Sequence, residues 1–170
     1  MALIKSVRGC TPTYGEDCYL AENATLIGDI QCGDQCSFWF QSVVRGDVSP
    51  IRMGDRVNIQ DGAVIHGTFE KSSTQIGNNV SIGHNAIVHG STIEDNVLVG
   101  MGAILMDHVH VESNVLIAAG AVVLENTRLE SGYLYAGVPA KKIKPLGENL
   151  IKGEIERIAK NYIKYSGWFK

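Results

Sequence analysis

Aliphatic side chains recur every six positions along most of this chain. The runs with this spacing are Leu26, Cys32, Phe38 and Val44; Met53, Ile59 and Ile65; Ile76, Ile82 and Val88; and Ile93, Val99, Leu105, Val111, Ile117, Val123, Leu129 and Tyr135. An α-helix cannot use this period, because six residues drift around a helix that turns about every 3.6 residues. The pattern instead predicts an all-β solenoid of short strands.

In such a solenoid each six-residue unit forms one flat face and one corner. Its aliphatic side chain points into a shared core, while Gly, Asn and Asp supply the corner conformations that other residues resist. Successive coils stack at about 4.7–4.9 Å, so that each coil pairs its backbone with the next. The repeats resemble the left-handed parallel β-helix of the hexapeptide-repeat family, and that resemblance implies the handedness. We expect about six coils over roughly residues 26–135, within a unit spanning residues 1–146.

The period changes after Tyr135-Ala136-Gly137-Val138-Pro139-Ala140. Apolar residues then follow helical spacing, at Ile151, Ile155, Ile158, Ala159 and Tyr162. We therefore expect residues 147–170 to contain an α-helix that packs its apolar stripe along the solenoid.

The six-residue period is broken at three places, and these breaks set the register of the polar residues. Three residues are inserted after Val44, five are inserted after Ile65, and one is missing after Val88. If each irregular step still counts as one hexad, these three residues lie on one face in successive coils. Arg45, His66 and His89 immediately follow them, and should stack in a column. Asp61 and His84 should form a second column on the preceding face.

Two histidines that are one strand spacing apart are close enough to share a metal ion. His84 is poorly placed to join His66 and His89 of its own chain, so we expect a threefold trimer in which His84 comes from the neighbouring subunit. Arg45 and Asp61 would then face each other across the same interface. Three neutral imidazoles leave one coordination position open, which is typical of catalytic zinc, and such zinc lowers the pKa of bound water to about 7. His108 and His110 do not share the register and are interpreted as surface residues.

Composition and charge exclude several other classes of protein. The hydrophobic share is 45 % and the charged share 19 %, which are values of a globular protein, and the net charge of −3 argues against nucleic acid as the main partner. The apolar runs are too short for a membrane span, and the start of the chain lacks an apolar segment of signal-peptide length. We therefore expect a cytoplasmic protein whose four cysteines are reduced thiols.

The polar residues of the irregular coils resemble those of the γ-class carbonic anhydrase family. The resemblance rests on Arg45-Gly46-Asp47, Asn58-Ile59-Gln60-Asp61, His66, Gly83-His84 and His89-Gly90, in that order and spacing. It implies a homotrimer with three intersubunit sites for zinc or, in some members, iron or cobalt. It also implies that His66, His84 and His89 are the ligands and that Gln60 orients the metal-bound water or bicarbonate. Arg45 and Asp61 would form the interface ion pair, with Asp47 as a further structural acid.

Two departures from that family predict that hydration of carbon dioxide is slow or absent. The best-studied type has a glutamate where this chain has Val48, and a long acidic loop whose glutamate moves protons. Here the corresponding loop, residues 67–74, is short and contains Glu70 as its only acid. Tyr133 and Tyr135 are further candidates for lining the site.

Two other functions remain open from the sequence. Tyr135-Ala136-Gly137-Val138-Pro139-Ala140-Lys141-Lys142-Ile143 also resembles the end of the solenoid in hexapeptide acyltransferases, which bind a coenzyme A thioester and need no metal. A trimer that binds metal without efficient catalysis is the third possibility.

Overall fold

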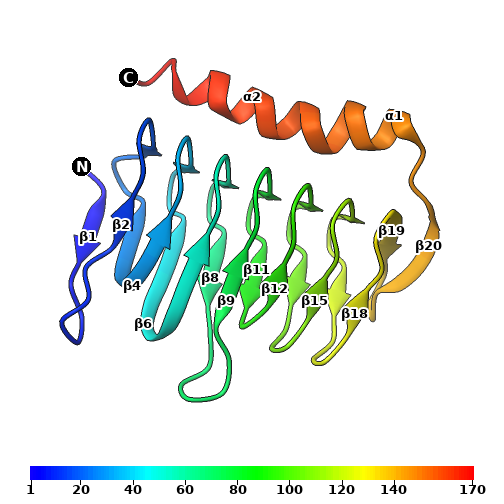
Figure 1. Ribbon diagram of the computed structural model, residues 1–170, viewed down its shortest axis with the longest axis horizontal. Helices are drawn as coiled ribbons and strands as arrows, with labels where there is room; N and C mark the ends of the chain where they lie inside the picture. The colour runs from blue at the N-terminus through cyan, green and yellow to red at the C-terminus, as the bar shows by residue number, and fades with distance from the viewer.

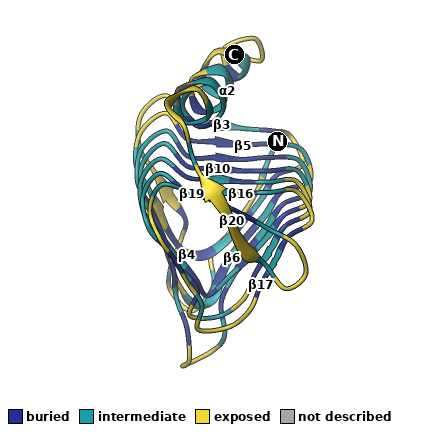
Figure 2. Cartoon of the chain, turned by 90° about the vertical axis from the view of Figure 1, so that its right-hand side faces the viewer, coloured by how far each residue is buried: buried dark blue, intermediate teal, exposed yellow. Residues whose placement is uncertain are grey.

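Three hexads form each triangular coil, and the coils stack into a parallel solenoid (Figures 1 and 2). A computed structural model describes residues 1–170, apart from the side chain of Lys152. The described residues form about seven turns that match a left-handed β-helix, followed by a C-terminal helix. The predicted fold class is therefore confirmed.

Each coil contributes one strand to each of three faces. The first face contains β3 (Tyr19–Leu20), β5 (Ser37–Phe38), β7 (Asn58–Ile59), β10 (Ser81–Ile82), β13 (Leu98–Val99), β16 (Leu116–Ile117), β19 (Tyr133–Ala136) and the antiparallel β20 (Lys141–Pro145). The second face contains β1 (Leu3–Lys5), β8 (Val64–His66), β11 (Ile87–His89), β14 (Ile104–Leu105) and β17 (Val122–Val123). The third face contains β2 (Thr13–Tyr14), β9 (Thr74–Ile76), β12 (Thr92–Ile93), β15 (His110–Val111) and β18 (Arg128–Leu129).

Two long strands join the second face to the third. β4 (Thr25–Cys32) and β6 (Val43–Met53) continue around a corner of the triangle, so each pairs on both faces. Val44 pairs with Leu26, and Met53 pairs with Cys32, with a register shift between these two ladders. The first irregular step therefore occurs inside a continuous strand.

The inward-facing positions form the predicted core. Ile59 and Ile82 pair across successive coils, as do Ile65 and Val88, and all four are fully buried. Burying one such side chain is worth about 1.5–3 kcal/mol, so the core depends on many small equal contributions. Figure 2 shows this buried lining around the inside of the triangle.

Asparagines turn many of the corners. Asn79 and Asn96 both have positive φ, which asparagine tolerates better than most residues. The Asn79 side-chain amide donates to the Asn96 side-chain oxygen at 3.1 Å, so successive corners are also linked through their side chains.

The solenoid begins earlier than the predicted repeats. Leu20 of β3 pairs with Phe38, and Tyr14 of β2 pairs with Cys32, so residues before Leu26 form a further coil. The expectation of about six coils starting near residue 26 was therefore one coil too short.

The C-terminal helix lies along the first face and runs back from the last coil toward the first (Figure 1). It consists of α1 (Glu148–Leu150), a π-helical segment (Ile151–Glu156) and α2 (Arg157–Ser166). Ile155 and Ala159 of the predicted stripe are buried. Phe169 reaches the first coils, where its ring packs 5.5 Å from that of Tyr19. Over the described residues, no helix combines the length and apolar character needed to cross a membrane.

Candidate metal centre

His66 and His89 stack as the register predicts. His66 ends β8, His89 ends β11, and the two residues pair directly in the parallel ladder. Arg45 belongs to β6, which pairs with β8 through the immediately preceding residues. The expected column of Arg45, His66 and His89 is thus present at the corner between the second and third faces.

The two imidazoles have the geometry of a chelating pair. His66 Nδ1 lies 3.2 Å from His89 Nε2. Two nitrogens bound to one tetrahedral zinc at about 2.0–2.1 Å would lie about 3.3–3.4 Å apart. The spacing of the pair therefore fits a zinc-sized cation without rearrangement of the backbone.

A carboxylate holds the other nitrogen of each ring. His66 Nε2 lies 3.2 Å from Asp47 Oδ1, and His89 Nδ1 lies 3.0 Å from Asp107 Oδ1. With those nitrogens donating to carboxylates, the two facing nitrogens of neutral rings both present lone pairs. A bound cation would satisfy both, and carboxylate support of this kind is typical of metal-binding histidines.

Burial and charge favour the neutral form of His66. Its pKa is lowered mainly by burial and further by the Arg45 guanidinium, against the opposing effect of Asp47. Burial acts to raise the pKa of Asp47, but hydrogen bonds from Arg45 and His66 lower it below its usual value. The pair thus combines a neutral imidazole with an ionised carboxylate, which is the protonation state that metal binding requires.

Sequence reasoning missed Asp107, which the loop between β8 and β9 holds beside His89. The Thr68 hydroxyl donates to Asp107 Oδ2 at 2.9 Å, and the Ser72 hydroxyl donates to Oδ1. These bonds and the one from His89 lower the pKa of Asp107 despite its partial burial. A Cβ at Gly90 would crowd the side chains of Asp107 and Ser72, and the positive φ at this position also favours glycine. The register signal was available, because Val88 pairs with Leu105 and Asp107 therefore lies one coil beyond Gly90.

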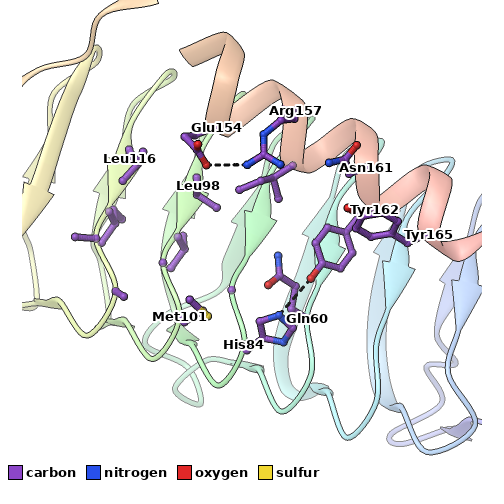
Figure 3. Close-up of a pocket in the computed structure, with 17 residues that line it drawn as sticks. Gln60, His84, Leu98, Met101, Leu116, Glu154, Arg157, Asn161, Tyr162 and Tyr165 are labelled. Carbon is purple, nitrogen blue, oxygen red and sulfur yellow. Dashed lines mark hydrogen bonds and ion pairs between the residues drawn. The ribbon is translucent and has the colours of Figure 1, made fainter. Parts of the chain in front are cut away.

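His84 lies at a different corner of the triangle, just after β10 of the first face. Its Nδ1 contacts Asp61 Oδ2 at 2.8 Å, which leaves Nε2 facing the Tyr162 hydroxyl at 3.3 Å (Figure 3). Tyr162 comes from α2 and was not predicted as a site residue. Burial, together with the charge of Asp61, raises the pKa of Tyr162 to about 12, so the hydroxyl remains protonated.

A largely apolar cavity of about 460 Å³ extends from His84 between the helix and the first face (Figure 3). Leu98, Leu116 and Ile158 are among its lining residues, and Met101 stands exposed beside it. Gln60 also lines it, but is buried, and its amide nitrogen donates to Asn58 Oδ1 at 3.0 Å. The cavity connects a histidine, an amide and a tyrosine to an apolar space.

The predicted charges have partners within their own chain. Arg45 Nη1 contacts Asp47 Oδ2 at 2.6 Å, while Asp61 contacts His84. Asp47 is therefore the acid that Arg45 meets within one subunit, and the pairing of Arg45 with Asp61 across an interface stays a prediction.

The positions of four other residues bear on expectations from the sequence. Tyr133 and Tyr135, the further candidates for lining the site, lie in β19, three coils beyond β10 and away from His84 within the chain. Tyr135 is buried and its hydroxyl accepts from the Glu130 backbone, because it closes the last coil of the core. Glu70 is exposed at the tip of its loop, and His108 is an exposed corner residue with positive φ.

Comparison with family models matches residues 90–125 to the bacterial transferase hexapeptide repeat. A solved hexapeptide transferase family protein from Anaplasma phagocytophilum superposes with a TM-score of 0.94 at 36 % identity, over 99 % of this chain and 98 % of that one. The fold is therefore shared over its whole length.

Several curated relatives are named carbonic anhydrases. A carbonic anhydrase of Geobacillus kaustophilus is 38 % identical over 99 % of this chain and 91 % of its own length. The mitochondrial gamma carbonic anhydrase 2 of Arabidopsis thaliana is 43 % identical over 90 % of this chain and 56 % of its own length.

Proposed function

The chain belongs to the γ-class carbonic anhydrase-like family of hexapeptide-repeat proteins, and from this premise we propose that it is a lyase that reversibly hydrates carbon dioxide at three metal sites between the subunits of a homotrimer. The observation that carries the proposal is the chelating pair of His66 and His89, spaced 3.2 Å apart and backed by two carboxylates. Acyl transfer from coenzyme A does not require such a pair.

In the proposed trimer, His66 and His89 of one subunit hold the ion together with His84 of the next. His66 would bind through Nδ1 and His89 through Nε2, because carboxylates occupy their other nitrogens. His84, whose Nδ1 contacts Asp61, would bind through Nε2 in place of the Tyr162 hydroxyl that faces this nitrogen. Zinc fits this donor set, and iron or cobalt would also be accepted by imidazole ligands. When bound, such an ion supplies a Lewis acid that brings the pKa of water close to neutrality.

The remaining residues orient the ligands and the substrate. The Gln60 amide nitrogen donates to Asn58, so its carbonyl oxygen is left to accept a hydrogen bond from water or bicarbonate. Asp47 orients His66, Arg45 holds Asp47, and Asp61 orients His84. The apolar cavity beside His84 suits carbon dioxide, which has no charge and little polarity.

The loop at residues 67–74 supports a positioning role rather than proton transfer. Thr68 and Ser72 are bonded to Asp107, while Glu70 is exposed at the loop tip. We therefore expect proton release to depend on external buffer. The hydration rate should rise with buffer concentration at constant pH, and a rate independent of buffer would contradict this part of the proposal.

Metal content and catalysis test the proposal together. Replacing His89 with alanine should remove one ion per chain and abolish hydration of carbon dioxide, whereas His108→Ala, at an exposed corner, should change neither. A wild-type protein that holds no more metal than the His89→Ala variant and binds acetyl coenzyme A would overturn the proposal. Stoichiometric metal without hydration above the level of a His84→Ala control would reduce it to a metal-binding trimer.

The intersubunit arrangement has its own test. His84→Ala and His66→Ala chains are each expected to bind the ion poorly, but mixed trimers of the two should recover part of the binding. Absence of recovery, with mixed trimers verified by native mass spectrometry, would show that all three ligands come from one chain.

A further inference from the structure

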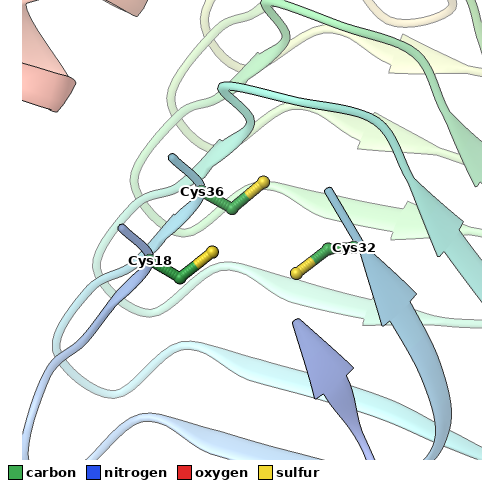
Figure 4. A group of neighbouring side chains, drawn as sticks. All are labelled: Cys18, Cys32 and Cys36. Atoms are coloured by element: carbon green, nitrogen blue, oxygen red, sulfur yellow. The ribbon is translucent and has the colours of Figure 1, made fainter. Parts of the chain in front are cut away.

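Three cysteine side chains meet inside the first coils of the solenoid. The sulfur atoms of Cys18, Cys32 and Cys36 all lie within 4.8 Å of one another, and Figure 4 shows the Cys32 side chain opposite those of Cys18 and Cys36. Cys18 and Cys36 occupy equivalent places in successive coils, because the residues that follow them, Tyr19 and Ser37, are paired. Cys32 approaches from the end of β4.

Packing alone does not require sulfur at these places. One coil further along, Val57 occupies the place equivalent to Cys36, and Met53 pairs with Cys32. The later coils continue both columns with aliphatic residues, such as Val80 and Ile76, which are also buried. Sulfur therefore replaces aliphatic side chains at one end of the solenoid, and three of the four cysteines converge there.

The cluster contains free thiols with the donor chemistry of a soft-metal site. All four cysteines of the chain are unbridged. Thiolate ligands select zinc and monovalent copper over hard cations such as magnesium. A metal–sulfur distance of about 2.3 Å requires sulfur atoms about 4 Å apart, which small side-chain rotations would provide here.

The surroundings allow an ion to enter and offset part of its charge. Cys18 and Cys32 are partly exposed, whereas Cys36 is buried. Three thiols that bind a divalent ion release three protons and leave a net charge of −1. Lys170 lies close by, since its ammonium group donates to the Asp17 carbonyl at 2.7 Å, directly before Cys18.

We propose that Cys18, Cys32 and Cys36 form a second metal site, made of sulfur alone, for a thiophilic d¹⁰ cation such as Zn²⁺ or Cu⁺. The ion would link the first coil to the second at one end of the stack. This site is independent of the histidine centre and of the proposed hydration of carbon dioxide.

Cadmium is a suitable probe, because cadmium thiolates absorb in the ultraviolet by charge transfer and cadmium imidazoles do not. The full chain carrying His66→Ala and His89→Ala, kept reduced and free of oxygen, removes the histidine centre from the measurement. Titration with Cd²⁺ should saturate the absorption at one ion per chain and raise the melting temperature. Competition with Zn²⁺ and with Cu⁺ would then rank the two natural candidates.

Adding Cys36→Val to this chain should abolish the saturable absorption without unfolding the protein, because valine occupies the equivalent place in the next coil. Cys10→Ser, at the cysteine outside the cluster, is the matched control and should leave the titration unchanged. A parent chain with no saturable absorption, or a Cys36→Val chain that retains it, would overturn the proposal.

Discussion

The regular coils and the irregular coils of this solenoid differ in what their corners do. From Ile93 to Leu129 the hexads follow one another without interruption, and the corner between the second and third faces is turned by single residues with positive φ, His108 and Asn126. Between Val44 and Ile93 that same corner is irregular in three successive coils. The predicted ligands and their carboxylates gather around these irregular coils.

The comparison shows that the regular repeat sets the spacing between coils, whereas the irregular steps provide the polar residues of the candidate metal site. Regular stacking sets His66 and His89 one coil apart. The inserted residues then provide what a regular corner lacks, namely Asp47 beside one ring and the loop hydroxyl of Ser72 that holds the acid of the other. Stability and site geometry should therefore respond to different substitutions.

The largest effect is expected on the free energy of unfolding, when a core side chain of the regular coils is removed. Leu129→Ala removes a buried side chain and should lower the free energy of unfolding by about 2–5 kcal/mol, with metal binding at the histidine centre unchanged. Urea unfolding measures the first and metal titration the second. Leu124→Ala, at an exposed position, is the matched control and should change stability by no more than about 0.5 kcal/mol. Equal losses of unfolding free energy at the two leucines would contradict the conclusion that the inward-facing side chains stabilise the solenoid.

An intermediate effect is expected from the acid beside His89. Asp107→Asn keeps the size of the side chain but removes the charge that orients the imidazole, and should weaken metal binding about 10- to 100-fold. Zinc titration with a competing chelator measures this affinity. Asp95→Asn is the comparison, because Asp95 accepts a backbone hydrogen bond from Asn78 at 2.6 Å in a corner without a histidine. Similar metal affinities in both variants would show that Asp107 does not support metal binding.

The smallest effect is expected from the ion pair on the surface of the loop. Lys71 contacts Glu125 at 2.6 Å, but both side chains are substantially exposed, so water and salt screen the pair. Lys71→Ala should leave the unfolding midpoint and the metal affinity unchanged within error. Ser72→Ala in the same loop should weaken metal binding by loosening Asp107, and the reverse ranking would refute the loop's role in positioning that acid.

The fold was predictable because the six-residue spacing of aliphatic side chains indicates both the short strands and the register between successive coils. The pairing of Ile82 with Ile59 and of His89 with His66 follows from counting each irregular step as one hexad. The first coil was missed although Tyr14 and Leu20 continue the same spacing, because bulky and polar neighbours obscure the period there.

Parts of the candidate site were harder to predict for a different reason. Tyr162 reaches His84 from the helix, and helical spacing gives no register relative to the coils. In the cysteine cluster, Cys32 and Cys18 occupy different positions within their six-residue units. The repeat spacing alone therefore does not predict that these two residues meet. Such contacts depend on where elements dock in space, which a repeat pattern does not encode.

The return path of the C-terminal helix has a consequence for how the protein is made. A solenoid can assemble coil by coil as it leaves the ribosome, since each coil needs only its neighbour. The segment that covers the first coils is synthesised after every coil, because Phe169 packs on Tyr19 and Lys170 binds the Asp17 carbonyl. The first face must therefore stay uncovered throughout synthesis, and a stalled nascent chain would present that face to chaperones or to other unfinished chains.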